Sequence, residues 1–343
     1  MKGKKAEETK EICCGDIGAI AKMDRVKTGD TLCDPKSIVK LAGMPYAEPC
    51  YSRAIAPKTR GQEEKLGTGL NRLNEEDPTF TVVNNAETHQ MVVSGAGDIQ
   101  IDVLVSKLKT RFGVDAELDT PRVPYREKIR KTVQKQGRHK KQTGGSGQFG
   151  VVNMRFEPLT NGEDFEFVNA IVGGVVPKEY IPAVEKGTRE AMKHGVLAGY
   201  PMIGVKATLF FGKYHPVDSK EVAFKSAARL AYKEACAKAQ PALIEPIYQY
   251  NITVPNEYTG AIMGDLSSRR GRVLGMNPDH KGHTIIEADV PELEIYGYGT
   301  TLRSMTGGSG EFSYEFARYE QAPSDIQAKE IEARASKVEK AEE

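Results

Sequence analysis

The sequence predicts an α+β protein of several domains, in which two ferredoxin-like split-βαβ units flank a middle domain. Its 343 residues suit two to four domains, at roughly 100–200 residues each. The order strand–helix–strand–strand–helix–strand occurs twice in the hydrophobic pattern, before and after the middle part. The hydrophobic content of 39% suits a globular core, and no apolar run approaches the roughly 18 residues of a membrane span.

Residues 1–37 contain short alternating pieces, around Ile17, Ala19 and Ala21, and a turn-rich TGDT segment at 28–31. Such pieces predict strands, but they are too few to close a barrel or to cover their own sheet edges. We therefore expect these residues to be the remnant of a β-barrel domain.

The first split-βαβ unit is expected between residues 45 and 120. Leu66, Leu70 and Leu73 recur at the spacing of one helix face. The predicted elements are a strand at 51–55, a helix at 62–75, strands at 80–83 and 90–93, a helix at 98–112 and a strand at 114–118.

The middle domain, residues 122–243, combines a basic stretch with two amphipathic helices, expected at 177–194 and 219–238. Between Arg122 and Lys141 there are nine Lys or Arg residues and a single acid, Glu127. The net charge of the whole chain is only +1, so any nucleic-acid surface is a local patch. Asp218 and Glu221 have the spacing of a capping box at the start of the second helix.

The second split-βαβ unit is expected at 244–320, after a break near Pro246. Its predicted elements are a strand at 248–254, a helix at 258–269, strands at 272–277 and 283–289, a helix at 296–305 and a strand at 311–317. The tail at 321–343 is highly charged with little apolar face, which predicts a frayed helix or a disordered end.

The string TGGSG occurs twice, at 143–147 and at 306–310. Neither copy fits the GxxxxGK[ST] or GxGxxG pattern of a nucleotide-binding loop. The second copy stands between a helix and a strand and predicts a structural turn. The first stands between two strands and follows basic residues, so it predicts a hairpin tip that contacts RNA backbone; a solvated charged arm is equally compatible with the charges. The candidate RNA-binding residues of this tip are Lys140, Lys141, Gln142, Thr143, Gly144, Gly145, Ser146 and Gly147.

A second candidate tip lies at FGKYHPVDS, where Lys213, Tyr214 and His215 could stack on RNA or donate hydrogen bonds to it. Arg269 and Arg270, at the end of a predicted helix, are candidate phosphate contacts. No Ser/His/Asp or Cys/His arrangement is evident, and the five cysteines and scattered histidines lack metal-ligand spacing. We expect no catalytic residue, no metal site and reduced cysteines.

Several long strings carry a resemblance to a known family. They include YREKIRKTV, GRHKKQTGGSGQFG, GGVVPKEYIPAVEKG, GKYHPVDSKEVAFK, KEACAKAQPALIEPI and GDLSSRRGRVLGM, and earlier GDIGAIAKMDRVKTGDTLCDP, EEDPTFTV and SGAGDIQIDVLVSKLK. From about residue 12 to residue 323, the chain resembles bacterial elongation factor G. Residues 1–37 then resemble the end of domain II, 45–120 domain III, 122–243 domain IV with a fold like domain 2 of ribosomal protein S5, and 244–320 domain V.

The resemblance implies a role in moving tRNA and mRNA through the ribosome. Family members couple this movement to GTP hydrolysis, and two tip loops of domain IV, matching 142–147 and 213–218, hold the codon–anticodon helix. Domain V contacts the large subunit, which makes Arg269 and Arg270 candidate rRNA contacts. The implied partners are the ribosome, with its 16S and 23S rRNA and stalk-base proteins, and the tRNA–mRNA pair. A cytoplasmic monomer without a membrane partner is expected.

The chain also departs from the family pattern. The P-loop GTPase domain is absent from it, so we expect no enzyme activity and no cofactor here, GTP and Mg²⁺ belonging to the missing domain. SGAGDIQIDV and GKYHP differ from the common forms and resemble a divergent paralogue. Alternatives are a ribosome-recycling or ribosomal-protection type paralogue, or a standalone ribosome-binding protein without a GTPase.

Overall fold

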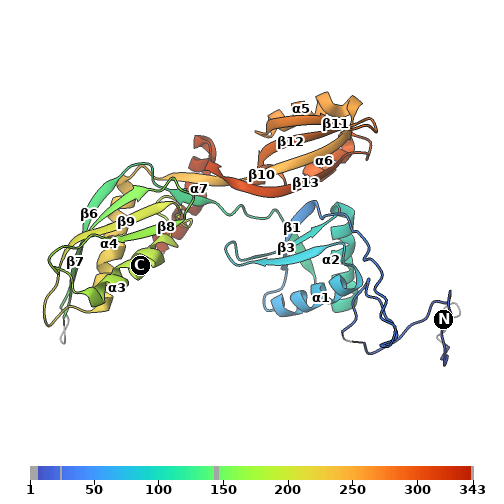
Figure 1. The fold of residues 1–343 in the computed structure, drawn as a ribbon, viewed down its shortest axis with the longest axis horizontal. Helices are drawn as coiled ribbons and strands as arrows, with labels where there is room; N and C mark the ends of the chain where they lie inside the picture. The colour runs from blue at the N-terminus through green and yellow to red at the C-terminus, as the bar shows by residue number, and fades with distance from the viewer. Residues whose placement is uncertain (1–6, 24, 143–146, 341–343) are drawn as a thin grey trace.

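The computed structural model describes residues 7–23, 25–142 and 147–340, and these residues form three β-sheets with associated helices (Figure 1). No helix among the described residues is long and apolar enough to cross a membrane. The α+β fold class predicted from the sequence is confirmed.

The first sheet belongs to the split-βαβ unit that follows residue 50. In sequence order its elements are β1 (Tyr51–Pro57), α1 (Glu63–Glu76), β2 (Thr81–Asn85), β3 (Gln90–Gly95), α2 (Asp98–Phe112) and β4 (Ala116–Asp119). The strand order is β2-β3-β1-β4 with antiparallel neighbours, which is the ferredoxin-like arrangement. Leu66, Leu70 and Leu73 are buried against α2 and the sheet, as the helical spacing predicts.

The same topology recurs after residue 241. The elements are β10 (Ala242–Pro255), η2 (Asn256–Tyr258), α5 (Thr259–Ser268), β11 (Arg272–Pro278), β12 (His283–Pro291), η3 (Glu292–Glu294), α6 (Tyr298–Met305) and β13 (Glu311–Gln321). The strand order β11-β12-β10-β13 repeats that of the first sheet position for position. The structural repeat predicted from the sequence is therefore present.

Strand β10 is longer than the predicted 248–254 and runs without interruption through Pro246. Its first residues pair with β5 (Arg126–Lys128), with Ala242 opposite Lys128 and Ile244 opposite Arg126. The expected break near Pro246 is therefore wrong at the level of secondary structure. On one side of β10, the pairing with β5 ends at Ile244 and the pairing with β12 begins at Ile247. Pro246 falls in this gap, where the ladder requires no N–H from β10 on that side.

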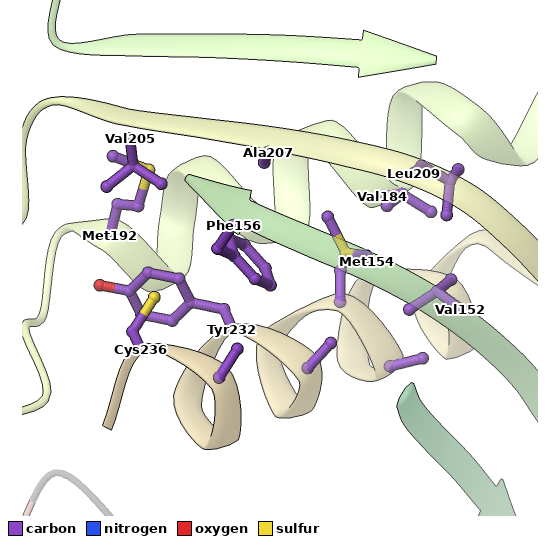
Figure 2. Packing of buried hydrophobic residues seen from close by; sticks show 14 of the residues in the cluster. Val152, Met154, Phe156, Val184, Met192, Val205, Ala207, Leu209, Tyr232 and Cys236 are labelled. Atoms are coloured by element: carbon purple, nitrogen blue, oxygen red, sulfur yellow. The ribbon is translucent and has the colours of Figure 1, made fainter. Parts of the chain in front are cut away.

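The middle domain contains a sheet with one face covered by helices. Its elements are β6 (Val133–Lys141), β7 (Gln148–Pro158), β8 (Phe165–Asn169), η1 (Lys178–Tyr180), α3 (Ile181–Met192), β9 (Val205–Lys213) and α4 (Glu221–Lys238), and the strand order is β6-β7-β9-β8. Strand β8 is parallel to β9, and the other neighbours are antiparallel. Met154 and Phe156 of β7 pack with Tyr232 of α4 in the core (Figure 2), and the Tyr232 hydroxyl donates to the Met202 sulfur (3.4 Å).

The predicted capping box at the start of α4 is not formed. The N-cap of α4 is Lys220, and no side chain caps this end of the helix. Ser219 and Asp218 take part instead in contacts between two loops, described below.

Residues 7–23 and 25–49 form no strand, so the strands expected around Ile17 and Ala21 are wrong for the described residues. The sole pairing recorded in these ranges is an isolated bridge between Asp34 and Ser37. Ile17 is 97% exposed, and a strand without a partner leaves its backbone groups unpaired.

The tail forms a helix, α7 (Ser324–Lys340), so its disordered alternative is wrong for these residues. The Leu243 N–H donates to Oε1 of Gln327 (2.9 Å), and the Tyr200 hydroxyl donates to Oε2 of Glu330 (2.8 Å). The Arg334 guanidinium lies 3.9 Å from the centre of the Tyr200 ring. Polar contacts to the middle domain and β10 therefore hold a helix that has little apolar face.

Candidate nucleic-acid interface

The β6–β7 hairpin carries the first TGGSG at its tip. The arms remain paired up to Lys141 and Gln148, so the predicted position between two strands is confirmed. Thr143, Gly144, Gly145 and Ser146 lie outside the described residues, and their predicted roles stay predictions. The second copy behaves as predicted: Gly307 and Gly308 follow α6 with φ of +58° and +87°, and the Gly308 N–H donates to the Arg303 carbonyl (2.9 Å).

The second candidate loop lies beside the hairpin tip. Pairing of Val151 with Lys213 places the ends of β7 and β9 next to each other. Lys213, Tyr214 and His215 are all exposed. The Phe149 ring meets the His215 ring edge-on, with centroids 6.3 Å apart. Residues about 70 positions apart in the sequence therefore form one surface.

The lysines of this surface are available to a ligand. Lys140, Lys141 and Lys213 are exposed, and none of them forms an ion pair with a described residue. Some basic residues of the 122–141 stretch have intramolecular partners. Arg126 donates to Glu87 (2.5 Å), and Arg130 donates to the Gln240 carbonyl (3.1 Å). Arg122 and Lys131 are exposed without a described ion-pair partner, so unpaired positive charge is present at both ends of the stretch. At the tip it would attract phosphates.

His215 is held by its own loop. Its Nδ1 accepts hydrogen bonds from the backbone N–H groups of Val217 (3.3 Å) and Asp218 (3.2 Å). A neutral imidazole that accepts at Nδ1 carries its proton on Nε2. The Asp218 carboxylate also lies near Nδ1, with its Oδ2 at 3.5 Å from that nitrogen. No described residue bonds Nε2, so an imidazole with its proton on Nε2 offers an N–H donor to a ligand.

A third loop at this end escaped the sequence interpretation. It follows β8, and because β8 is parallel to β9 the two strands end toward the same edge. Gly173 and Gly174 have φ of +73° and +68°, and Val172 is 83% exposed. The adjacent glycines were the available signal, but only the parallel pairing shows that the loop adjoins the tip.

Arg269 and Arg270 lie at the end of α5, where the sequence placed them, but their guanidinium groups have intramolecular partners. Arg269 pairs with Asp265 (2.9 Å) and lies 5.2 Å from the Tyr298 ring centre. Arg270, at φ +58°, makes two hydrogen bonds to the nearly buried Glu245 (2.6 and 3.1 Å). A phosphate would have to compete with these carboxylates, and the rRNA-binding role of the pair stays a prediction.

Within residues 7–340, masked positions apart, no group of three or more His, Cys, Asp or Glu side chains could hold a metal ion. All five cysteines are free thiols, and Cys236 is buried in the middle-domain core. The surface at the tip can bind by charge, hydrogen bonding and stacking.

The fold and the tip define a class: multidomain α+β proteins that present paired loops on a domain between two ferredoxin-like units. The chain belongs to the elongation factor G family. The matching family models are Elongation Factor G, domain III at residues 46–120, Elongation factor G, domain IV at 121–240, and Elongation factor G C-terminus at 242–330.

A solved structure is also similar over most of the chain. It is a crystal structure of a protein from Thermus thermophilus, with 40% sequence identity and a TM-score of 0.78. The match covers 85% of this chain and 44% of the other. The chain therefore spans less than half the length of that neighbour.

Proposed function

We propose that this chain is the ribosome- and RNA-contacting half of an elongation-factor-G-like translational GTPase that promotes movement of tRNA and mRNA during protein synthesis. The observation that carries the proposal is the convergence of two loops at the end of the middle domain. They bring exposed lysines, an aromatic ring and a histidine N–H donor onto one surface, and the lysines form no ion pair with any residue that the structure describes.

In this mechanism the tip of the middle domain acts by inserting and binding, and no covalent bond is made or broken by this chain. Amide, imidazole and bare backbone groups at the tip hold a codon–anticodon duplex by its shape and its 2′-hydroxyls, without reading its sequence. This suits a factor that must accept every codon. Lysines behind the tip supply attraction to phosphates that weakens as salt concentration rises.

The remaining assignments follow from the same proposal. The partners are the ribosome, through 16S and 23S rRNA and stalk-base proteins, and the tRNA–mRNA pair. The protein acts in the cytoplasm as a monomer. The chain does not hydrolyse GTP; that step, with GTP and Mg²⁺, falls to the GTPase domain of such factors.

Replacing Gln142 or His215 by alanine in the full-length factor tests the role of the tip. Each substitution removes a side-chain donor while leaving the lysines in place, so translocation is expected to slow by at least about tenfold, the value of one charge-assisted or well-placed hydrogen bond. The measurement is single-turnover translocation on ribosomes, with ribosome affinity determined in parallel. Unchanged translocation by both variants contradicts the assignment.

Sedimentation of the 343-residue chain with ribosomes provides the complementary measurement. Binding at low salt that weakens at high salt is expected for contacts dominated by phosphates. A variant with Lys140, Lys141 and Lys213 replaced by glutamine should show a shallower salt dependence. The control replaces Lys58 and Lys109, which pair with Asp115, and should retain the slope of the parent chain.

A further inference from the structure

Ser219 lies between the two tip loops and bonds to both. Its side chain is among the buried polar groups, with 8% exposure. The hydroxyl accepts a hydrogen bond from the His215 N–H (2.8 Å) and donates one to the Phe149 carbonyl (2.8 Å). One hydroxyl therefore joins the loop of His215 to the strand that leaves the TGGSG tip.

A second bond strengthens the same link. The Phe149 N–H donates to the Asp218 carbonyl (2.9 Å), so both backbone polar groups of Phe149 bond to the 213–219 loop. The pairing of β7 with β9 ends at Val151 and Lys213. These two bonds continue the connection beyond the end of the sheet.

Ser219 directly precedes the N-cap residue of α4, so its hydroxyl would be expected to cap the helix. A serine at such a place commonly caps the helix, and its loss from a cap costs stability. Helix α4 has no side-chain cap, and the Ser219 hydroxyl is bonded across the loops instead. The Ser219 carbonyl also accepts from the Tyr180 hydroxyl (3.2 Å), which fixes the backbone at this point.

We propose that Ser219 is a positioning residue that makes the two tip loops one unit and sets the imidazole of His215 for RNA. By holding the His215 N–H, it shapes the turn in which Nδ1 accepts from Val217 and Asp218. The Nε2–H donor is then presented in one orientation to an acceptor oxygen of the RNA duplex. The inference rests on the proposed RNA-binding function of the tip.

The test compares three variants of the chain: Ser219→Ala, Ser219→Thr, which keeps a hydroxyl, and Ser309→Ala. Ser309 is the matched control because its hydroxyl bonds a carbonyl in the second TGGSG turn, away from the tip. The first measurement is amide hydrogen exchange at His215 together with the ¹⁵N shifts of its imidazole. Ser219→Ala should speed exchange of the His215 amide about fivefold or more and mix the two ring tautomers. Ser219→Thr and Ser309→Ala should leave both unchanged.

The second measurement is the yield of photo-cross-links to RNA from a benzophenone amino acid at position 214, with the chain bound to ribosomes that carry mRNA and tRNA. The yield should fall about fivefold in Ser219→Ala and return in Ser219→Thr. The inference is overturned if Ser219→Ala changes neither the amide exchange at His215 nor the yield of RNA cross-links. It is also overturned if the cross-link yield falls in Ser219→Ala and Ser219→Thr does not restore it. If the parent chain itself gives no RNA cross-link, the proposed function fails, and the exchange measurement alone decides whether Ser219 joins the loops.

Discussion

Glu127, the single acid of the basic stretch, is fully buried and bonded to backbone groups. Its carboxylate accepts hydrogen bonds from the N–H groups of Leu197 (2.9 Å), Ala198 (2.8 Å) and Tyr200 (3.1 Å). Burial raises the pKa of the Glu127 carboxyl, and these three donors offset part of that effect. The residue therefore shapes the 195–200 loop at the base of the middle domain.

Replacing Glu127 by glutamine should lower the free energy of unfolding by about 1–3 kcal/mol, because an amide NH₂ then faces backbone donors in a buried place. A raised folded-state pKa means that the group's favourable contribution is fully present below the unfolded value of about 4.3 and is lost as the pH rises through the folded value. The difference in the free energy of unfolding between the parent protein and Glu127→Gln should therefore be largest at acid pH and decrease toward neutral pH. Urea unfolding between pH 4 and 8 measures it, and a gap that widens with pH contradicts this account.

Helix α4 packs against the β6–β7 hairpin and holds it in position. Ala223, Ala227 and Ala231 are fully buried, so the helix lies close to the sheet. A Cβ on Gly137 of β6 would come within 1.9 Å of the Ala227 carbonyl oxygen. Gly137 therefore allows α4 to pack closely on β6. The position of the β6–β7 hairpin depends on this close packing.

Gly137→Ala should destabilise the middle domain by about 3 kcal/mol, because the added methyl group meets backbone that cannot move independently. The matched control is Gly264→Ala in α5, where a Cβ meets nothing within 4 Å. That change should be neutral or stabilise by up to about 1 kcal/mol through helix propensity. Thermal and urea unfolding of both variants measure the difference, and equal stabilities would disprove the close-packing argument.

The sequence predicted elements well where the pattern is local. The leucine spacing of 66, 70 and 73 predicted α1, and the two βαββαβ orders predicted two sheets with the same topology. It failed where tertiary contacts decide. Pro246 resembled a break but lies within β10. Helix α7 is held by hydrogen bonds of Gln327 and Glu330 together with packing of Ile326 against the cluster around Leu243.

The candidate site was predictable as motifs but not as a surface. Lys140, Lys141 and His215 were identified by residue type and by resemblance. The link through Ser219 and the loop at Gly173 depend on the pairing of β7, β8 and β9, which no local pattern encodes. Local physics also could not tell an RNA-binding tip from a solvated arm.

At the scale of the molecule, Arg126 lies where three domains meet. Its guanidinium donates to Glu87 of the first unit and lies 5.6 Å from the ring centre of Tyr319, which belongs to β13 of the second. The Tyr319 hydroxyl donates to the Pro124 carbonyl (3.2 Å), and α7 adds its contacts to Tyr200 and Leu243. These contacts hold the base of the middle domain, where Figure 1 shows α7, at a distance from the far end of the β6–β7 hairpin.

The most direct test of the proposed function is photo-cross-linking from the tip of the chain on ribosomes that carry mRNA and tRNA. A benzophenone amino acid is placed at Gln142, and at Phe316 of β13, which is 51% exposed, as the control. We expect position 142 to cross-link to mRNA, tRNA or the decoding region of 16S rRNA, and we expect no such cross-link from position 316. Ribosome binding without any such cross-link from position 142 would contradict it.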